Sequence, residues 1–127
     1  MERVRWIEYK GKRILYADFR GQKGKEAMET LELGAKMAAL SPKKVLMLSN
    51  FEGAAGSPEW FARVKELGKE VFDVKVEKDA VVGITGVKAV LMEAYNKVTR
   101  KGVVVFKTEA EALEWLVKED SKHSTRD

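Results

Sequence analysis

Residues 45–72, VLMLSNFEGAAGSPEWFARVKELGKEVF, decide the fold of this chain. Residues 45–48 form a short apolar run that is typical of a buried strand, and a glycine-rich loop follows at 51–56. Ser57 and Pro58 then start a helix, because a serine hydroxyl caps free N–H groups and proline fits the first helical position. The segment therefore predicts a strand followed by a helix, as in an α/β protein.

The helix that begins at Ser57 is amphipathic. Its polar face carries Arg63, Lys65, Glu66, Lys69 and Glu70. The apolar residues recur at helical spacing and predict one buried stripe: Trp60, Phe61, Val64, Leu67, Gly68, Val71 and Phe72.

Similar patterns extend in both directions along the chain. Strands are predicted at 4–9, 13–18, 80–84 and 103–106. Further helices are predicted from after Gly21 to Leu40, from Thr85-Gly86 to about Val98, and after a capping box at 108–111. The order is ββαβαβαβα. It predicts a five-stranded, mostly parallel sheet whose first strand is antiparallel. In the third helix we expect an inward-facing set: Val87, Val90, Leu91, Ala94 and Val98.

Composition limits the protein to one domain. The chain has 127 residues, of which 45% are apolar, and we place the domain at 1–117 and a polar, disordered tail at 118–127. No cysteine is present, and the single histidine, His123, lies in the tail. These counts exclude disulfides and thiolate or histidine metal clusters, so we expect no metal and no cofactor. No apolar run approaches the length of a membrane span, and a cytoplasmic protein is expected.

Polar residues should gather where the parallel strands end, because loops at that edge of the sheet bind ligands. The candidates for binding a partner or an anion are Asn50, Ser57, Thr85 and Lys88, with Ser57 also a candidate phosphorylation site. The alternative is that the hydroxyls only cap helices.

Several apolar side chains fall outside the predicted core stripes. Leu33, Met37 and Leu40 lie opposite the core side of the first long helix. Trp115 lies roughly opposite Leu113 and Leu116, and Met92 lies off the main stripe of the third helix. They form either an interface, with a partner or in a homodimer, or isolated surface apolar residues. Lysines and arginines precede several strands, but no aromatic residues alternate with them, so neither nucleic acid nor a membrane is the expected partner.

Three segments resemble the STAS and SpoIIAA-like family, and more narrowly its small stand-alone STAS/SEC14 domain proteins. They are YKGKRILYADFR at 9–20, AVVGITGVK at 80–88 and FKTEAEALEWL at 106–116, and the likeness extends to Val117. It implies a SpoIIAA-like fold and a non-enzymatic signalling domain that binds proteins, as the anti-sigma-factor antagonists do. Those antagonists carry a phosphorylatable serine after an aspartate at the second helix, whereas here Gly56 precedes Ser57.

Two functions remain open from the sequence. The first is a regulatory protein-interaction module that uses residues 50–57 and the helix after them. The second is a small lipid or apolar-ligand binder of SEC14-like type. An enzyme is not expected, because the sequence offers no nucleophile and base pair.

Overall fold

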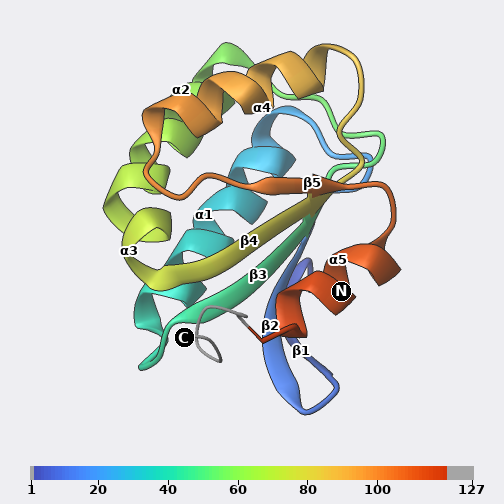
Figure 1. Cartoon of the computed structure of the whole chain (residues 1–127). Helices are drawn as coiled ribbons and strands as arrows, with labels where there is room; N and C mark the ends of the chain where they lie inside the picture. The colour runs from blue at the N-terminus through green and yellow to red at the C-terminus, as the bar shows by residue number, and fades with distance from the viewer. Residues whose placement is uncertain (1, 120–127) are drawn as a thin grey trace.

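The protein, described here by a computed structural model for residues 2–119, is a five-stranded α/β domain (Figure 1). Its elements follow the predicted ββαβαβαβα order, with two short helical turns added after the second long helix. The elements are β1 (Val4–Tyr9), β2 (Lys12–Asp18), α1 (Gly24–Leu40), β3 (Val45–Asn50), α2 (Pro58–Leu67), the π-helical turn η1 (Gly68–Phe72), α3 (Asp73–Lys75), β4 (Val76–Val82), α4 (Val87–Val98), β5 (Val104–Phe106) and α5 (Glu109–Val117).

The strands lie in the order β1-β2-β3-β4-β5. β1 and β2 are antiparallel, and every other neighbouring pair is parallel. A tight turn joins β1 to β2, in which Lys10 and Gly11 take positive φ angles of 49° and 81°. The predicted mixed sheet with an antiparallel first strand is confirmed.

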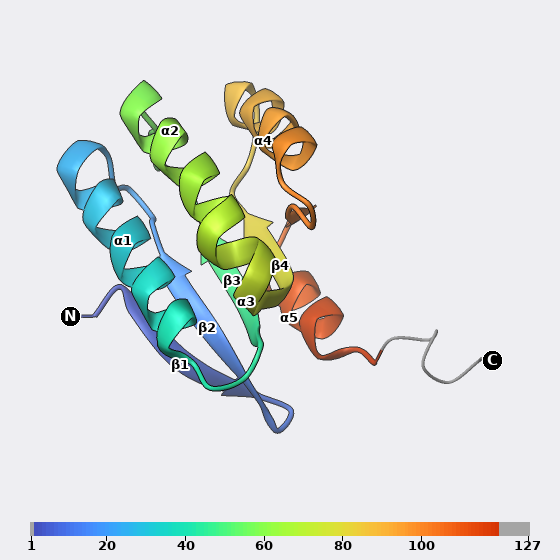
Figure 2. The ribbon, with the colours of Figure 1, turned by 90° about the vertical axis from the view of Figure 1, so that its left-hand side faces the viewer.

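Helices cover both faces of the sheet (Figure 2). On one face Leu15 and Met47 pack with Trp60 of α2 and the buried residues of α1. On the other face Ile14 and Leu48 pack with Leu116 of α5. Alternate residues of each central strand therefore enter different apolar clusters, as a strand buried on both faces requires.

β4 is longer than the sequence analysis predicted. It begins at Val76, which pairs with Val45, and not at Ala80. The charged residues Glu77, Lys78 and Asp79 consequently lie within the strand and not before it. The sequence analysis missed these three residues because it took the apolar run alone as the strand, and they are charged.

The prediction for the buried side of α4 was wrong. Val90, Ala94 and Val98 are exposed, whereas Met92 and Tyr95 are buried against Val81 and Ile84. Two apolar stripes compete on this helix, and the larger Met92 and Tyr95 side chains remove more apolar surface from water.

The start of α4 also differs from the expectation. Gly86 occupies the N-cap position with a φ of 59°, and no side chain caps the helix, so Thr85 is not its cap. Lys118 and Glu119 follow α5 without helix or strand structure, and the rest of the predicted tail, 120–127, lies outside the described residues.

The turn η1 brings α2 close to the end of α4. A Cβ atom on Gly68 would lie 2.7 Å from Thr99 Cγ2 and 2.8 Å from the Tyr95 hydroxyl. Only glycine permits this approach, which places the end of α4 beside η1.

Candidate functional site

Asn50, a predicted binding residue, is held in a buried network at the carboxyl end of the sheet. Its Nδ2 donates to Glu109 Oε2 at 2.7 Å, and its Oδ1 accepts from the Glu52 amide at 3.0 Å. The same Glu109 oxygen accepts from the Tyr16 hydroxyl. Burial, together with this carboxylate, raises the pKa of Tyr16 to about 12. Asn50 is 5% exposed and its polar atoms are satisfied, so it has a structural role.

A second network lies beside the first. Arg20 Nε and Nη2 donate to the two carboxylate oxygens of Asp18, each at 2.9 Å, and Arg3 Nη1 lies 3.4 Å from Oδ1. The Arg20 hydrogen bonds, opposed in part by burial, hold the pKa of Asp18 below its usual value. The carboxyl end of the sheet thus contains charges that pair with one another.

The other predicted site residues make local contacts. Ser57 Oγ accepts from the Trp60 amide at 3.1 Å, which is the predicted N-cap. Lys88 Nζ donates to the Phe51 carbonyl at 3.1 Å. Thr85 is exposed. The capping serine is half-buried, so part of it is accessible at the surface.

Leu33, Met37 and Trp115, three of the candidate interface residues, do not share one environment. Leu33 is 42% exposed, whereas Met37 is half-buried against the cluster under α1. Trp115 packs on Phe106, with ring centroids 5.4 Å apart, and Lys78 Nζ lies 5.1 Å from its centroid.

Exposed apolar side chains also lie on α4 and β5, which the sequence analysis treated as core. We call them the α4–β5 surface: Val90 (66% exposed), Val98 (43%) and Val105 (45%), with Ala94 between the two α4 valines. Val104 (42% exposed) faces the other side of the sheet, because it pairs with Ala80 of the α5 cluster whereas Val105 pairs with Val81 of the α4 cluster. The sequence contains a signal for this surface. Val90, Ala94 and Val98 form one apolar stripe on the helix, and Met92 and Tyr95 form a second stripe that competes with it for burial.

One edge of β5 faces away from β4, because β5 ends the strand order. Just before the strand, the Asn96 side chain accepts from the Val103 N–H at 2.7 Å and donates to the Val103 carbonyl at 3.1 Å. In an extended chain, residues two apart direct their N–H and C=O groups to the same edge. The N–H and C=O of Val105 therefore face the outer edge of β5, as those of Val103 do. Among residues 2–119 the Asn96 side chain pairs with this edge at Val103 and not at Val105.

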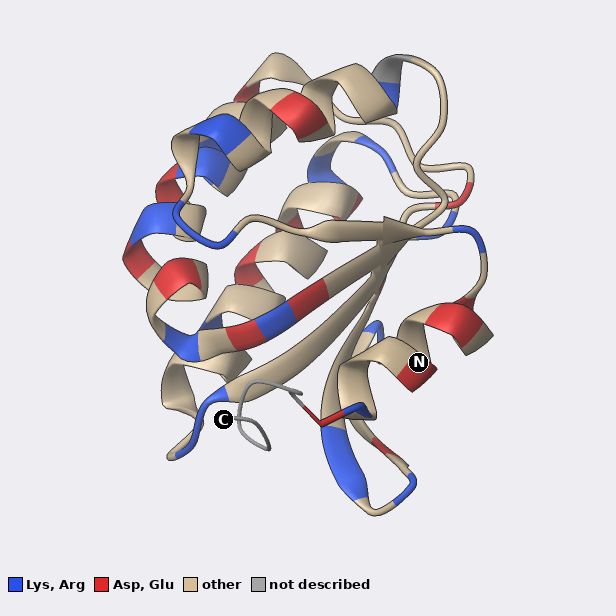
Figure 3. Ribbon diagram, viewed as in Figure 1, with Lys and Arg blue, Asp and Glu red and all other residues tan. Residues whose placement is uncertain are grey.

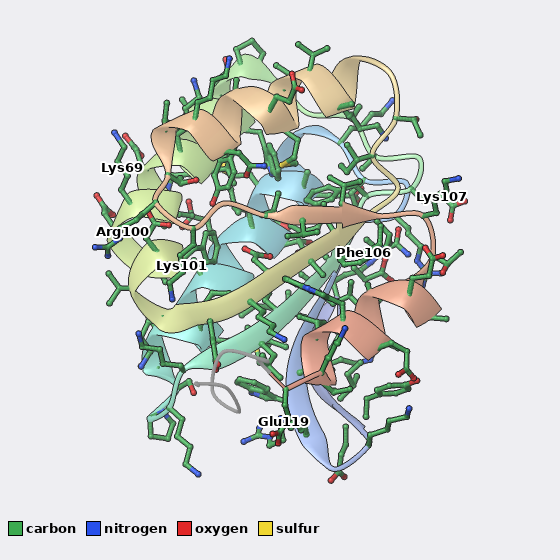
Figure 4. The ribbon with its side chains drawn as sticks, in the orientation of Figure 1. Lys69, Arg100, Lys101, Phe106, Lys107 and Glu119 are labelled. Atoms are coloured by element: carbon green, nitrogen blue, oxygen red, sulfur yellow. The ribbon has the colours of Figure 1, made fainter. Side chains whose placement is uncertain are left out.

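Basic residues surround the α4–β5 surface (Figure 3). Arg100 and Lys101 precede β5, and Lys107 follows it (Figure 4). Lys97 lies on the last turn of α4. Among residues 2–119 none of these four takes part in a salt bridge. The one acidic residue of α4 is Glu93. The Asp73 carboxylate accepts from the Arg100 and Lys101 amides at 2.8 and 3.1 Å, so the four basic side chains outnumber the acidic ones, Asp73 and Glu93, along this border.

The described residues offer neither a metal cluster nor a membrane-spanning helix. In the part of the chain that the structure describes, no three carboxylate or histidine side chains gather as a metal site. No helix there combines the length and apolar character that crossing a bilayer demands.

Comparison with known proteins identifies the fold. No protein-family model matches the sequence, and a search of curated proteins finds no significant match. Among solved structures, the chain is similar to an uncharacterized protein of the DUF3478 family from Shewanella loihica PV-4, whose crystal structure has a SpoIIAA-like fold. The two share 18% sequence identity at a TM-score of 0.68, over 89% of this chain and 91% of that one. The chain therefore has a SpoIIAA-like fold.

Proposed function

We propose that this protein is a non-enzymatic regulatory module that binds a partner protein through the α4–β5 surface. The partner contributes an extended apolar segment with acidic residues beside it, which pairs with the outer edge of β5. The observation that carries the proposal is the outer edge of β5 at Val105, for which no backbone partner lies among residues 2–119, together with the exposed valines of the α4–β5 surface.

Backbone pairing favours a peptide as the occupant. An exposed strand edge is a template for a further strand, whose main-chain groups supply affinity while alternate side chains supply specificity. The Asn96 amide already pairs with Val103 in the way that a peptide unit would. A peptide that continues from that point would satisfy Val105 next.

Charge determines which peptide fits. The positive border of Lys97, Arg100, Lys101 and Lys107 attracts acidic residues, and it would repel the same border on a second copy of the chain. A homodimer through this surface is therefore disfavoured. A bilayer of anionic lipid shares the charge complementarity but offers no strand to the backbone edge.

A random-peptide selection against the purified protein tests the proposal. Enriched peptides should be extended, rich in β-branched residues and flanked by Asp or Glu. The key variant is Val105→Pro, which removes the outward N–H while an edge strand tolerates proline. Val105→Thr keeps the N–H and is its matched control.

We expect Val105→Pro to weaken peptide binding at least tenfold and Val105→Thr to change it less than threefold, each with the fold retained by circular dichroism. Equal binding by both variants would overturn the proposal. So would binding to anionic vesicles in place of any peptide.

A further inference from the structure

An open hollow of about 730 Å³ lies at the amino end of β3, the end opposite Asn50. Its lining comes from the start of β2, the loop between α1 and β3, the start of β4 and the residues that end and follow α5. The apolar part of this lining includes Val45 and Leu116, which are 2% and 1% exposed. Small-molecule sites in proteins are roughly 300 to 1,000 Å³ in volume, so the hollow has room for such a ligand.

Basic side chains dominate the lining, and we call this space the basic hollow. Figure 3 shows basic residues on the hairpin between β1 and β2, on the loop before β3 and on β4. Two carboxylates, Glu77 and Glu119, also line the space. Among residues 2–119 no salt bridge includes these carboxylates or any of the cations of the lining. The six cations are Lys12, Arg13, Lys43, Lys44, Lys78 and Lys118.

The end of α1 does not account for the two lysines of the loop before β3. Lysines that follow a helix can bind its last carbonyl groups. Here the Ser41 N–H donates to the Ala38 carbonyl at 3.2 Å, and Lys75 Nζ, from outside the hollow, donates to the Ser41 carbonyl. Lys43 and Lys44 are exposed, and neither side chain donates a hydrogen bond to another of residues 2–119. Both ammonium groups are therefore available to an anion.

Hydrogen bonds hold two segments of the lining in place. Lys78 Nζ donates to the Trp115 and Lys118 carbonyls at 3.0 and 2.7 Å, which fixes the end of α5 beside β4. The Ser41 hydroxyl donates to the Lys43 carbonyl at 2.7 Å and accepts from the Lys43 N–H at 3.3 Å. The cations are thus arranged around the space before a ligand arrives, which lowers the cost of binding.

We propose that the basic hollow binds a compact, soluble small molecule with several phosphate groups. A phosphate monoester carries about −1.5 to −2 charge at pH 7 and three acceptor oxygens, so a few such groups match cations that come from four segments. Arg13 supplies the paired N–H donors that phosphate oxygens accept. The site shares no residue with the α4–β5 surface, so it does not depend on the proposed function.

The lining favours a compact ligand over a nucleic-acid strand. Trp6 is the one aromatic residue of the described lining. The Arg13 guanidinium lies 4.2 Å from its ring centroid, and the ring also packs against the apolar cluster under α1. A base therefore has no free ring on which to stack, whereas single-strand binding proteins rely on such rings.

Isothermal titration calorimetry of the whole protein with inositol 1,4,5-trisphosphate tests the site. The salt concentration is about 0.15 M, at which attraction between distant exposed charges is screened. We expect saturable, submillimolar binding. Citrate, which carries three carboxylates on a compact body, should bind at least tenfold more weakly, because each carboxylate carries less charge than a phosphate.

The key variant is Lys43→Gln combined with Lys44→Gln, which should weaken trisphosphate binding at least tenfold. Lys65→Gln combined with Lys69→Gln is the matched control. It changes the net charge equally, at exposed positions of α2 and η1 outside the hollow, and should change binding less than threefold. All four positions are exposed, so both variants should keep the circular dichroism spectrum of the wild type.

A lipid headgroup offers the same phosphate chemistry, so vesicles that contain phosphatidylinositol 4,5-bisphosphate form a second arm. Binding to these vesicles without binding to the free trisphosphate would overturn the proposal of a soluble ligand. Equal losses in the two double variants would reduce the effect to general charge attraction and would also overturn it. So would citrate binding as tightly as the trisphosphate, tighter binding of a single-stranded oligonucleotide, or no saturable trisphosphate binding at millimolar concentration.

Discussion

Replacing Asp79 by Asn should stabilise the protein, and the gain should grow with pH. Burial raises the pKa of this carboxyl from 3.8 to about 8, so the folded state holds a proton that the unfolded state has lost above pH 4. The free energy of unfolding therefore falls by about 1.4 kcal/mol per pH unit between pH 3.8 and about pH 8. Above about pH 8 the ionisation of Asp79 lowers it no further. By pH 7 the accumulated loss is on the order of 4 kcal/mol.

Urea denaturation of the wild type and Asp79→Asn at pH 4, 5.5 and 7 measures this loss directly. The two proteins should have similar stability at pH 4, where Asp79 is protonated in the folded state, and should diverge at higher pH. Other groups titrate equally in both, so the difference isolates Asp79. A difference that stays constant over this pH range would refute the raised pKa of the Asp79 carboxyl.

Three further substitutions test the packing and the cap, and thermal or urea denaturation measures each. Gly68→Ala should cost about 1 to 3 kcal/mol, because the new Cβ meets Thr99 and Tyr95, and unchanged stability would show that η1 and α4 are farther apart. Trp60→Ala should cost about 3 to 5 kcal/mol, because it leaves a cavity and removes the indole hydrogen bond to the Ala27 carbonyl; a loss under about 1 kcal/mol would place the ring at the surface. Ser57→Asp should preserve stability, since aspartate caps as well as serine, whereas Ser57→Ala should cost about 1 kcal/mol; equal losses would contradict the cap.

The architecture could be predicted from local patterns because each strand contains a short apolar run and two of the helices begin at a capping hydroxyl. Ser57 and Thr108 cap their helices as predicted, since a hydroxyl before a helix has one strongly favoured role. α4 could not be assigned in the same way. Its two apolar stripes are equally good by periodicity, and tertiary packing decides between them, because Met92 and Tyr95 are buried against Val81 and Ile84.

The candidate site was harder to predict than the fold. Asn50 sits at the expected sheet edge, but its polar atoms are used by Glu109 and Glu52, which a linear sequence does not reveal. Asp79 was placed before the strand because it lies in a charged run, and its position within β4 depends on the β3 and β4 register. The open edge at Val105 depends on strand order, which is a tertiary property.

The central claim is that a partner segment pairs with the outer edge of β5. Amide hydrogen exchange, measured by NMR with and without a selected acidic-flanked peptide, tests it most directly. The account predicts that the Val105 N–H becomes protected on binding, since that group gains a backbone partner, while the loop at 51–57 is unchanged. Protection confined to that loop or to the β1 edge, with Val105 exchanging as before, would contradict it.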